Sequence, residues 1–129
     1  MSVPQAAQAA QPLRFSFAYY DTDHQKGYCL SAWPNGEIAE SLNRLKEISN
    51  LTQPQLAQGG KTYRFHPVDW SKTTEKNGFP AGVPRHLEAY QFALVGVNQK
   101  KARVFGGIYM GVFYIVWFDH DHKIWECDF

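Results

Sequence analysis

The residues best suited to chemistry lie near the end of the chain. Four titratable residues, 119–122, directly follow an apolar stretch, 112–118, and Arg103 begins the strand predicted before it. Histidine exchanges protons near neutral pH because its ordinary pKa is about 6.5. The planar guanidinium of arginine donates two parallel hydrogen bonds to a phosphate. We therefore interpret Arg103 as a phosphate-binding residue and His120 or His122 as a proton-transfer residue.

Each of these residues also has a simpler interpretation. Arg103 can pair with an acid on a neighbouring strand, such as Glu88, and residues 119–122 can form a polar turn after a buried strand. A metal site at residues 119–122 is another alternative, because aspartate and histidine bind zinc and manganese. A strand presents only alternate residues to one side, so His24 or His66 would have to complete the ligand set. We predict no metal and no cofactor.

Charge is unevenly distributed along the chain. The net charge is +1, but residues 61–103 hold eight basic and three acidic side chains, a local excess of +5. A local basic surface can bind a polyanion even when the whole chain is nearly neutral. An ordinary solvated surface is the alternative. The side chains that we expect to contact a polyanion, five by charge and one tyrosine by stacking, are Lys61, Arg64, Arg85, Lys100, Lys101 and Tyr114.

Length and composition predict a single domain. The chain has 129 residues, 16% of them aromatic, which favours a sheet-rich core. Residues 1–12 are small and polar, so we expect a flexible tail before a domain at 13–129. No apolar run reaches the roughly 20 residues needed to span a bilayer, and no secretory signal is visible. We interpret Cys29 and Cys127 as reduced thiols and expect a cytoplasmic protein.

The first half of the domain predicts one strand and two helices. Residues 13–20 alternate between apolar and other side chains, as in a strand with one buried face. A helix is expected over 37–50, with Asn35 as its N-cap. A second, short helix is expected to begin with a capping box at Thr52 and to end at the glycine pair 59–60. The predicted apolar face of the longer helix comprises Ile38, Leu42, Leu45 and Ile48.

The second half predicts four strands and one long loop, at residues 68–84. We therefore predict the α+β class: an N-terminal strand, a helical hairpin that covers one sheet face, and then an antiparallel four-stranded meander. If the last strand continues to His122, alternation places His120 and His122 on one face with Tyr114 and Phe118, and Asp119 on the other. The predicted strands of the meander are 61–65, 88–97, 102–108 and 112–118.

This order, with Arg103 opening one late strand and histidines after the next, resembles the RelE/ParE-like superfamily of small toxins. The resemblance in topology covers about residues 13–125, and in sequence it rests mainly on 103–108 (RVFGGI) and 113–123 (FYIVWFDHDHK). Many members cut messenger RNA, on the ribosome or free. The resemblance implies that Arg103 steadies the scissile phosphate, that His120 or His122 moves protons, and that an antitoxin covers the basic face.

Two hypotheses follow. The first is a toxin-like endoribonuclease that cleaves messenger RNA by metal-independent acid–base catalysis and is neutralised by an antitoxin. It requires Arg103 and His120 or His122 to converge on one water-accessible hollow. The second is a non-catalytic protein-binding module that inhibits or regulates a nucleic-acid-processing complex. The near-neutral charge and the acids near the C-terminus, which would repel a phosphate, favour the second.

Overall fold

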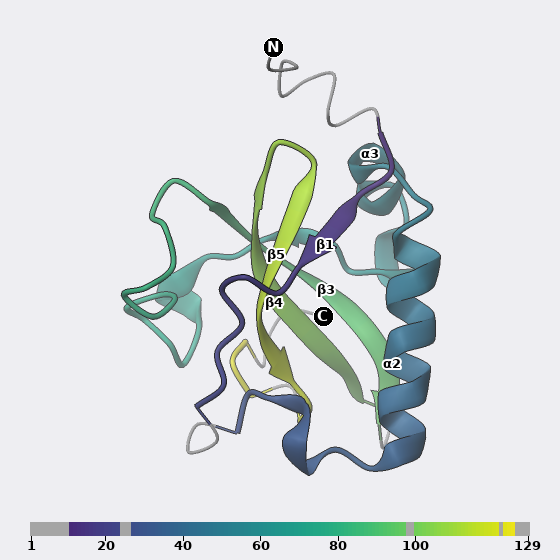
Figure 1. Ribbon diagram of the computed structural model, residues 1–129, viewed down its shortest axis with the longest axis horizontal. Helices are drawn as coiled ribbons and strands as arrows, with labels where there is room; N and C mark the ends of the chain where they lie inside the picture. Colours follow the sequence, from purple (N-terminus) through teal and green to yellow (C-terminus); the bar gives the residue numbers. More distant parts are fainter. Residues whose placement is uncertain (1–10, 24–26, 98–99, 122, 126–129) are drawn as a thin grey trace.

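The computed structural model describes residues 11–23, 27–97, 100–121 and 123–125. Within these residues the chain forms a mixed sheet of five strands in the order β1-β5-β4-β3-β2, with two α-helices (Figure 1). Strand β1 is parallel to β5, and the other neighbours are antiparallel. The predicted α+β class is confirmed. The elements are β1 (Arg14–Ser16), α2 (Asn35–Ile48), α3 (Gln53–Ala57), β2 (His66–Pro67), β3 (Glu88–Val97), β4 (Lys100–Tyr109) and β5 (Val112–Asp119).

Several predicted elements and element boundaries are wrong. Strand β1 is much shorter than 13–20, because the Ser16 hydroxyl accepts the Ala18 N–H and turns the chain. Asn35 is the first residue of α2, and Pro34 occupies the N-cap. The predicted strand at 61–65 is absent, because Arg64 has a left-handed backbone (φ 48°), which breaks strand geometry.

One face of the sheet is covered by α2 and α3 (Figure 1). We call it the helix face. Phe92 and Phe113 are fully buried there, with ring centroids 5.1 Å apart. The buried stripe of α2 runs through Ser41, Leu45 and Ile48, whereas Leu42 is 53% exposed. The predicted helix is therefore confirmed: Leu45 and Ile48 of its predicted inward face are buried and Ile38 packs against the core, whereas Ser41 takes the place of Leu42.

The opposite face, which we call the loop face, is covered by residues 68–87 and by the segment after β5. Val83 and Leu87 from the long loop pack with Phe105, Trp117 and Ile124. This loop contains a short 3-10 helix, Trp70–Lys72. Two further 3-10 helices, Leu30–Ala32 and Gly60–Thr62, connect other elements. In the described part of the chain, no helix is long and apolar enough to cross a membrane.

A β-bulge in β5 decides which side chains reach each face. Phe105 pairs with Trp117 but Gly106 pairs with Ile115, so Val116 is an extra residue. The extra residue inverts the alternation between the two halves of β5. Tyr114 therefore lies on the loop face and Phe118 on the helix face. The prediction that these two residues share a face is wrong.

Candidate functional site

Arg103 is buried on the loop face. Its side chain is 3% exposed, and it lies in β4 directly opposite Asp119 in β5, which is 2% exposed. Directly opposed residues on neighbouring strands project from the same sheet face. The carboxylate of Asp119 accepts the backbone N–H groups of Lys123 at 2.9 Å and Ile124 at 2.7 Å. Arg103 thus lies beneath the segment that follows β5, where RNA has no access to it. Glu88, the acid expected beside Arg103, pairs with Ile108 at the other end of β4.

His120 lies on the helix face, at the edge between β5 and α2. Its Nε2 is 2.5 Å from Glu37 in the first turn of α2, its Nδ1 is 2.8 Å from Asp121, and its ring contacts Trp33. Burial lowers the pKa of His120, but hydrogen bonds and charge attraction from Glu37 and Asp121 outweigh it and raise the pKa overall. The imidazole between these two carboxylates links α2 to the end of β5.

The structure does not bring Arg103 and His120 together. They lie on opposite faces of the sheet, and two carboxylates already contact the imidazole. The expected hollow shared by these two side chains is therefore not formed. His122 and Cys127 lie outside the described residues.

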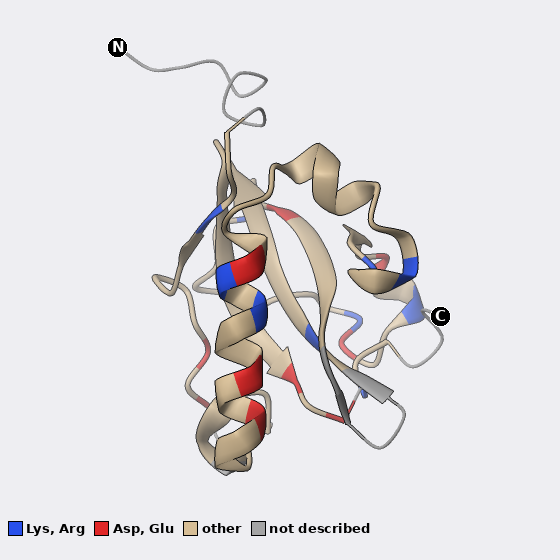
Figure 2. Ribbon diagram, turned by 90° about the vertical axis from the view of Figure 1, so that its right-hand side faces the viewer, with Lys and Arg blue, Asp and Glu red and all other residues tan. Residues whose placement is uncertain are grey.

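The predicted polyanion-binding residues are dispersed. Lys61 and Arg85 are exposed, in the 3-10 helix before β2 and in the long loop. Arg64 is half-buried, and Tyr114 packs on Tyr19 with a centroid distance of 5.3 Å. The backbones of residues 100 and 101 belong to β4, but their side chains lie outside the described part. Basic and acidic positions are interspersed along the ribbon in the view of Figure 2.

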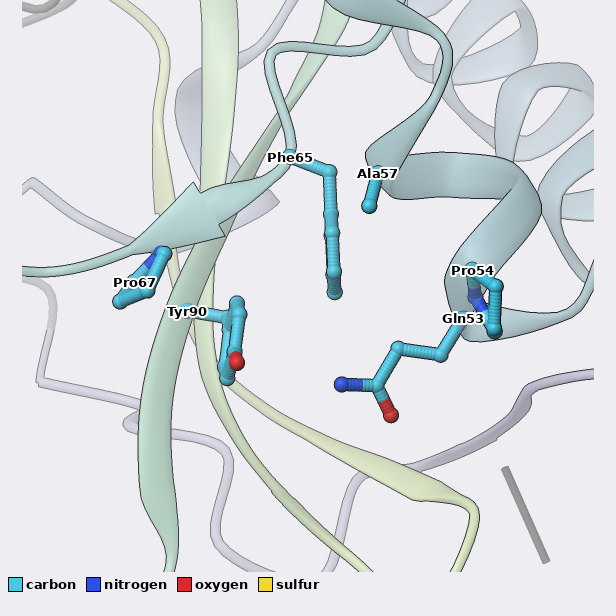
Figure 3. Close-up of a pocket in the computed structure, with 6 residues that line it drawn as sticks. All are labelled: Gln53, Pro54, Ala57, Phe65, Pro67 and Tyr90. Carbon is cyan, nitrogen blue, oxygen red and sulfur yellow. The ribbon is translucent and has the colours of Figure 1, made fainter. Parts of the chain in front are cut away.

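An open apolar groove lies between α3 and the β2–β3 edge of the sheet. Its volume is about 320 Å³, and its wall includes the rings of Phe65 and Tyr90, stacked at 4.8 Å with an interplanar angle of 13° (Figure 3). The side chain of Gln53 extends from α3 towards Tyr90. The lining contains no charged side chain; the groove is lined by Gln53, Pro54, Ala57, Phe65, Pro67 and Tyr90.

One carboxylate stands beside this groove. Glu88 is exposed, and its Oε1 accepts a hydrogen bond from the Tyr90 hydroxyl at 3.3 Å. Burial raises the pKa of Tyr90, and Glu88 raises it further. The phenol therefore stays neutral and acts as a donor at physiological pH. The groove thus combines an uncharged apolar wall with one acidic group at its rim.

The groove is not evident from the sequence. Its residues come from three separate segments, around 53–57, 65–67 and 90, which only the fold brings together. The sequence shows that these segments contain proline and aromatic residues, but their spacing does not indicate that they are neighbours in the fold. Comparisons of this chain with protein-family models, with curated proteins and with solved structures found no match.

Proposed function

We propose that this chain is a non-catalytic protein-binding module on a RelE/ParE-like scaffold, and that it regulates a nucleic-acid-processing complex in the cytoplasm. The observation that carries the proposal is the separation of Arg103 and His120 by the sheet. Metal-independent RNA cleavage needs a cation and proton-transfer groups around one phosphate. A buried arginine and a histidine held between two carboxylates on the other face do not supply that arrangement.

The groove between α3 and β3 is the proposed docking site. Its size, about 320 Å³, suits one or two apolar side chains of a partner. Stacked aromatic rings in a groove are typical anchors for an extended peptide segment. The Glu88 carboxylate at the rim makes no ion pair with any described residue. By charge complementarity, the partner segment is an extended stretch with an apolar anchor next to a lysine or arginine.

The test is selection of peptides from a random displayed library on the purified chain, followed by affinity measurement. We expect enriched peptides to carry an apolar anchor beside a basic residue. Ala57→Arg places a long charged side chain at an exposed lining position and should weaken binding roughly tenfold or more. Gln58→Arg adds the same charge one residue further along and is the matched control. Equal binding to both variants would contradict the proposed site.

The toxin-like endoribonuclease is the second candidate, with different residues in the catalytic roles. The order strand, two helices and four strands favours it, as does an exposed surface beside the tip of the β4–β5 hairpin. There His86 packs edge-on against Tyr109, 42% exposed, at a centroid distance of 5.0 Å, and Arg85 is its exposed neighbour. In this candidate Arg85 holds the phosphate, His86 transfers a proton, and an antitoxin covers this surface.

Induced expression in bacteria separates the two candidates. If the chain is an endoribonuclease, expression should arrest growth and deplete messenger RNA, and His86→Ala should restore growth. The purified chain should then cleave messenger RNA either on ribosomes or free in solution. The exposed Arg14→Ala is the matched control. His122→Ala tests the remaining histidine of the original hypothesis. If wild-type expression leaves messenger RNA intact, the nuclease candidate is wrong and the binding module stands.

A further inference from the structure

A second cavity lies on the loop face, and it differs in chemistry from the groove. Its volume is about 140 Å³, and residues between 70 and 87 line it together with Ala89 of β3. Two aromatic rings, Trp70 and Phe79, lie beside two cations, Lys76 and Arg85. None of the lining residues is acidic. A cavity with aromatic walls and only cationic charge selects a flat ligand that carries negative charge.

The aromatic wall is fixed by packing. Trp70 meets Phe79 edge-on at 4.9 Å between ring centroids and stacks on the buried Phe105 at 6.4 Å. Gly78 lies against the Trp70 indole, where an added Cβ would come within 3.4 Å of Nε1, and its φ of +79° favours glycine. The loop backbone can therefore pass close to the indole and hold it in place. The ring position is set before any ligand arrives.

The cations at the cavity have unused donors. Arg85 is exposed and makes no ion pair or hydrogen bond with the described residues. Lys76 donates one hydrogen bond, to the Ser71 carbonyl at 2.8 Å, which leaves two of its three N–H groups. The nearby acids are engaged elsewhere, because Asp69 accepts from Ser71 and Glu75 accepts from Tyr28. Both cations can therefore reach a ligand anion.

We infer that this cavity binds a nucleotide, with the base against Trp70 and Phe79 and the phosphate outside, between Lys76 and Arg85. The volume is below the roughly 300–1,000 Å³ of pockets for whole drug-sized ligands, so it accommodates one small ring rather than a complete nucleotide. A pyrimidine is the best fit by size. The inference does not depend on the proposed protein-binding function, because the two cavities share no lining residue, but it shares Arg85 with the endoribonuclease candidate.

Titration of the full chain with uridine 5′-monophosphate, followed by NMR of the tryptophan indole N–H groups, tests the site. We expect the Trp70 indole signal to move, while the signal of Trp33, buried on the helix face, stays in place. Uridine without phosphate should bind roughly tenfold more weakly, because it lacks the charge-assisted hydrogen bonds. A tetrauridylate tests whether the bound nucleotide is part of an RNA chain. Tighter binding of the tetrauridylate than of the monophosphate would identify single-stranded RNA as the ligand. Equal binding would identify a free nucleotide.

Arg85→Glu is the decisive variant because the residue is exposed and the fold should tolerate it. We expect it to weaken binding of the monophosphate by at least about tenfold. Lys46→Glu reverses a charge at an exposed position on α2 and should leave binding unchanged. The inference is wrong if millimolar nucleotide leaves the Trp70 signal unmoved, if uridine binds as well as its phosphate, or if both variants lose affinity equally.

Discussion

The two faces of the sheet are covered by different kinds of structure and bury different kinds of side chain. The helix face is closed by α2 and α3, and its buried core is almost entirely apolar. The loop face is closed by irregular chain, and three polar side chains of the sheet, Gln91, Arg103 and Asp119, are buried beneath it. Helices satisfy their own backbone hydrogen bonds, whereas a covering loop needs partners for its N–H and C=O groups.

The difference explains why titratable residues near the end of this chain are poor evidence for catalysis. The carboxylate of Asp119 holds the segment after β5 through two backbone N–H groups. His120, one residue further, holds the start of α2 through Glu37. Each residue thus fastens a different covering element to the same strand. A polar run after an apolar strand can serve packing on both faces.

The largest effect is expected on the loop face, at Arg103. Arg103→Ala removes a buried cation and leaves the carboxylate of the neighbouring Asp119 buried without it. A buried charge that loses its partner lowers the free energy of unfolding by about 3–5 kcal/mol. Arg85→Ala, at an exposed position, should change the free energy of unfolding by no more than about 0.5 kcal/mol. Urea denaturation measures both. Equal stability of the two variants would show that Arg103 is not buried. A harmless Arg103→Ala variant in a growth assay would therefore report unfolding rather than lost catalysis.

Two adjacent glycines of β4 probe the rigidity of each face. A Cβ on Gly106 would overlap the Tyr114 carbonyl oxygen and the Phe113 ring, whereas one on Gly107 would meet the Leu87 side chain. Backbone and a packed ring cannot move aside, but Leu87 belongs to the loop. Gly106→Ala should destabilise by about 1–3 kcal/mol and Gly107→Ala by clearly less. Thermal unfolding of the two variants provides the measurement, and the reverse order would mean that the loop is the stiffer cover.

The smallest effect concerns the His120 link to α2. Because the pKa of His120 is raised in the folded state, the link stabilises the protein below the unfolded pKa of about 6.5 and is lost as pH rises through the folded pKa. Glu37, Asp121 and, through Asp121, Lys123 are the charged groups involved. Glu37→Gln should lower the free energy of unfolding by about 1 kcal/mol near pH 6 and by less near pH 9. A pH-independent difference would contradict this link.

The elements that the sequence predicts correctly are those determined by interactions between residues close in the chain. Strand β3 begins and ends at the predicted residues, and the capping box of α3 forms between Thr52 and Gln55 as expected. The strand is predicted from the alternation of apolar and other side chains, and the capping box from hydrogen bonds between side chains and backbone groups three residues apart. A strand, two α-helices and the strands β3, β4 and β5 also follow in the predicted order, whereas β2 (His66–Pro67) lies after the predicted strand 61–65.

The positions of Arg103 and His120 relative to each other could not be predicted, because one extra residue in β5 changes the face from which its later side chains project. Residues 113–118 are all apolar, so nothing in their pattern marks the bulge at Val116. Without the bulge, every later side chain of β5 would project from the opposite face. The left-handed Arg64 is similarly invisible in the sequence. The groove and the cavity depend on tertiary contacts between distant segments.

The most direct test of the separation between Arg103 and His120 is an NMR pH titration of the His120 imidazole in two variants. Arg103→Met keeps the buried volume while removing the cation, and Glu37→Gln removes a contacting carboxylate. We predict that the pKa of His120 is unchanged by Arg103→Met and lowered by Glu37→Gln. A rise in the His120 pKa in Arg103→Met would place the two side chains in one site and show that the sheet does not separate them.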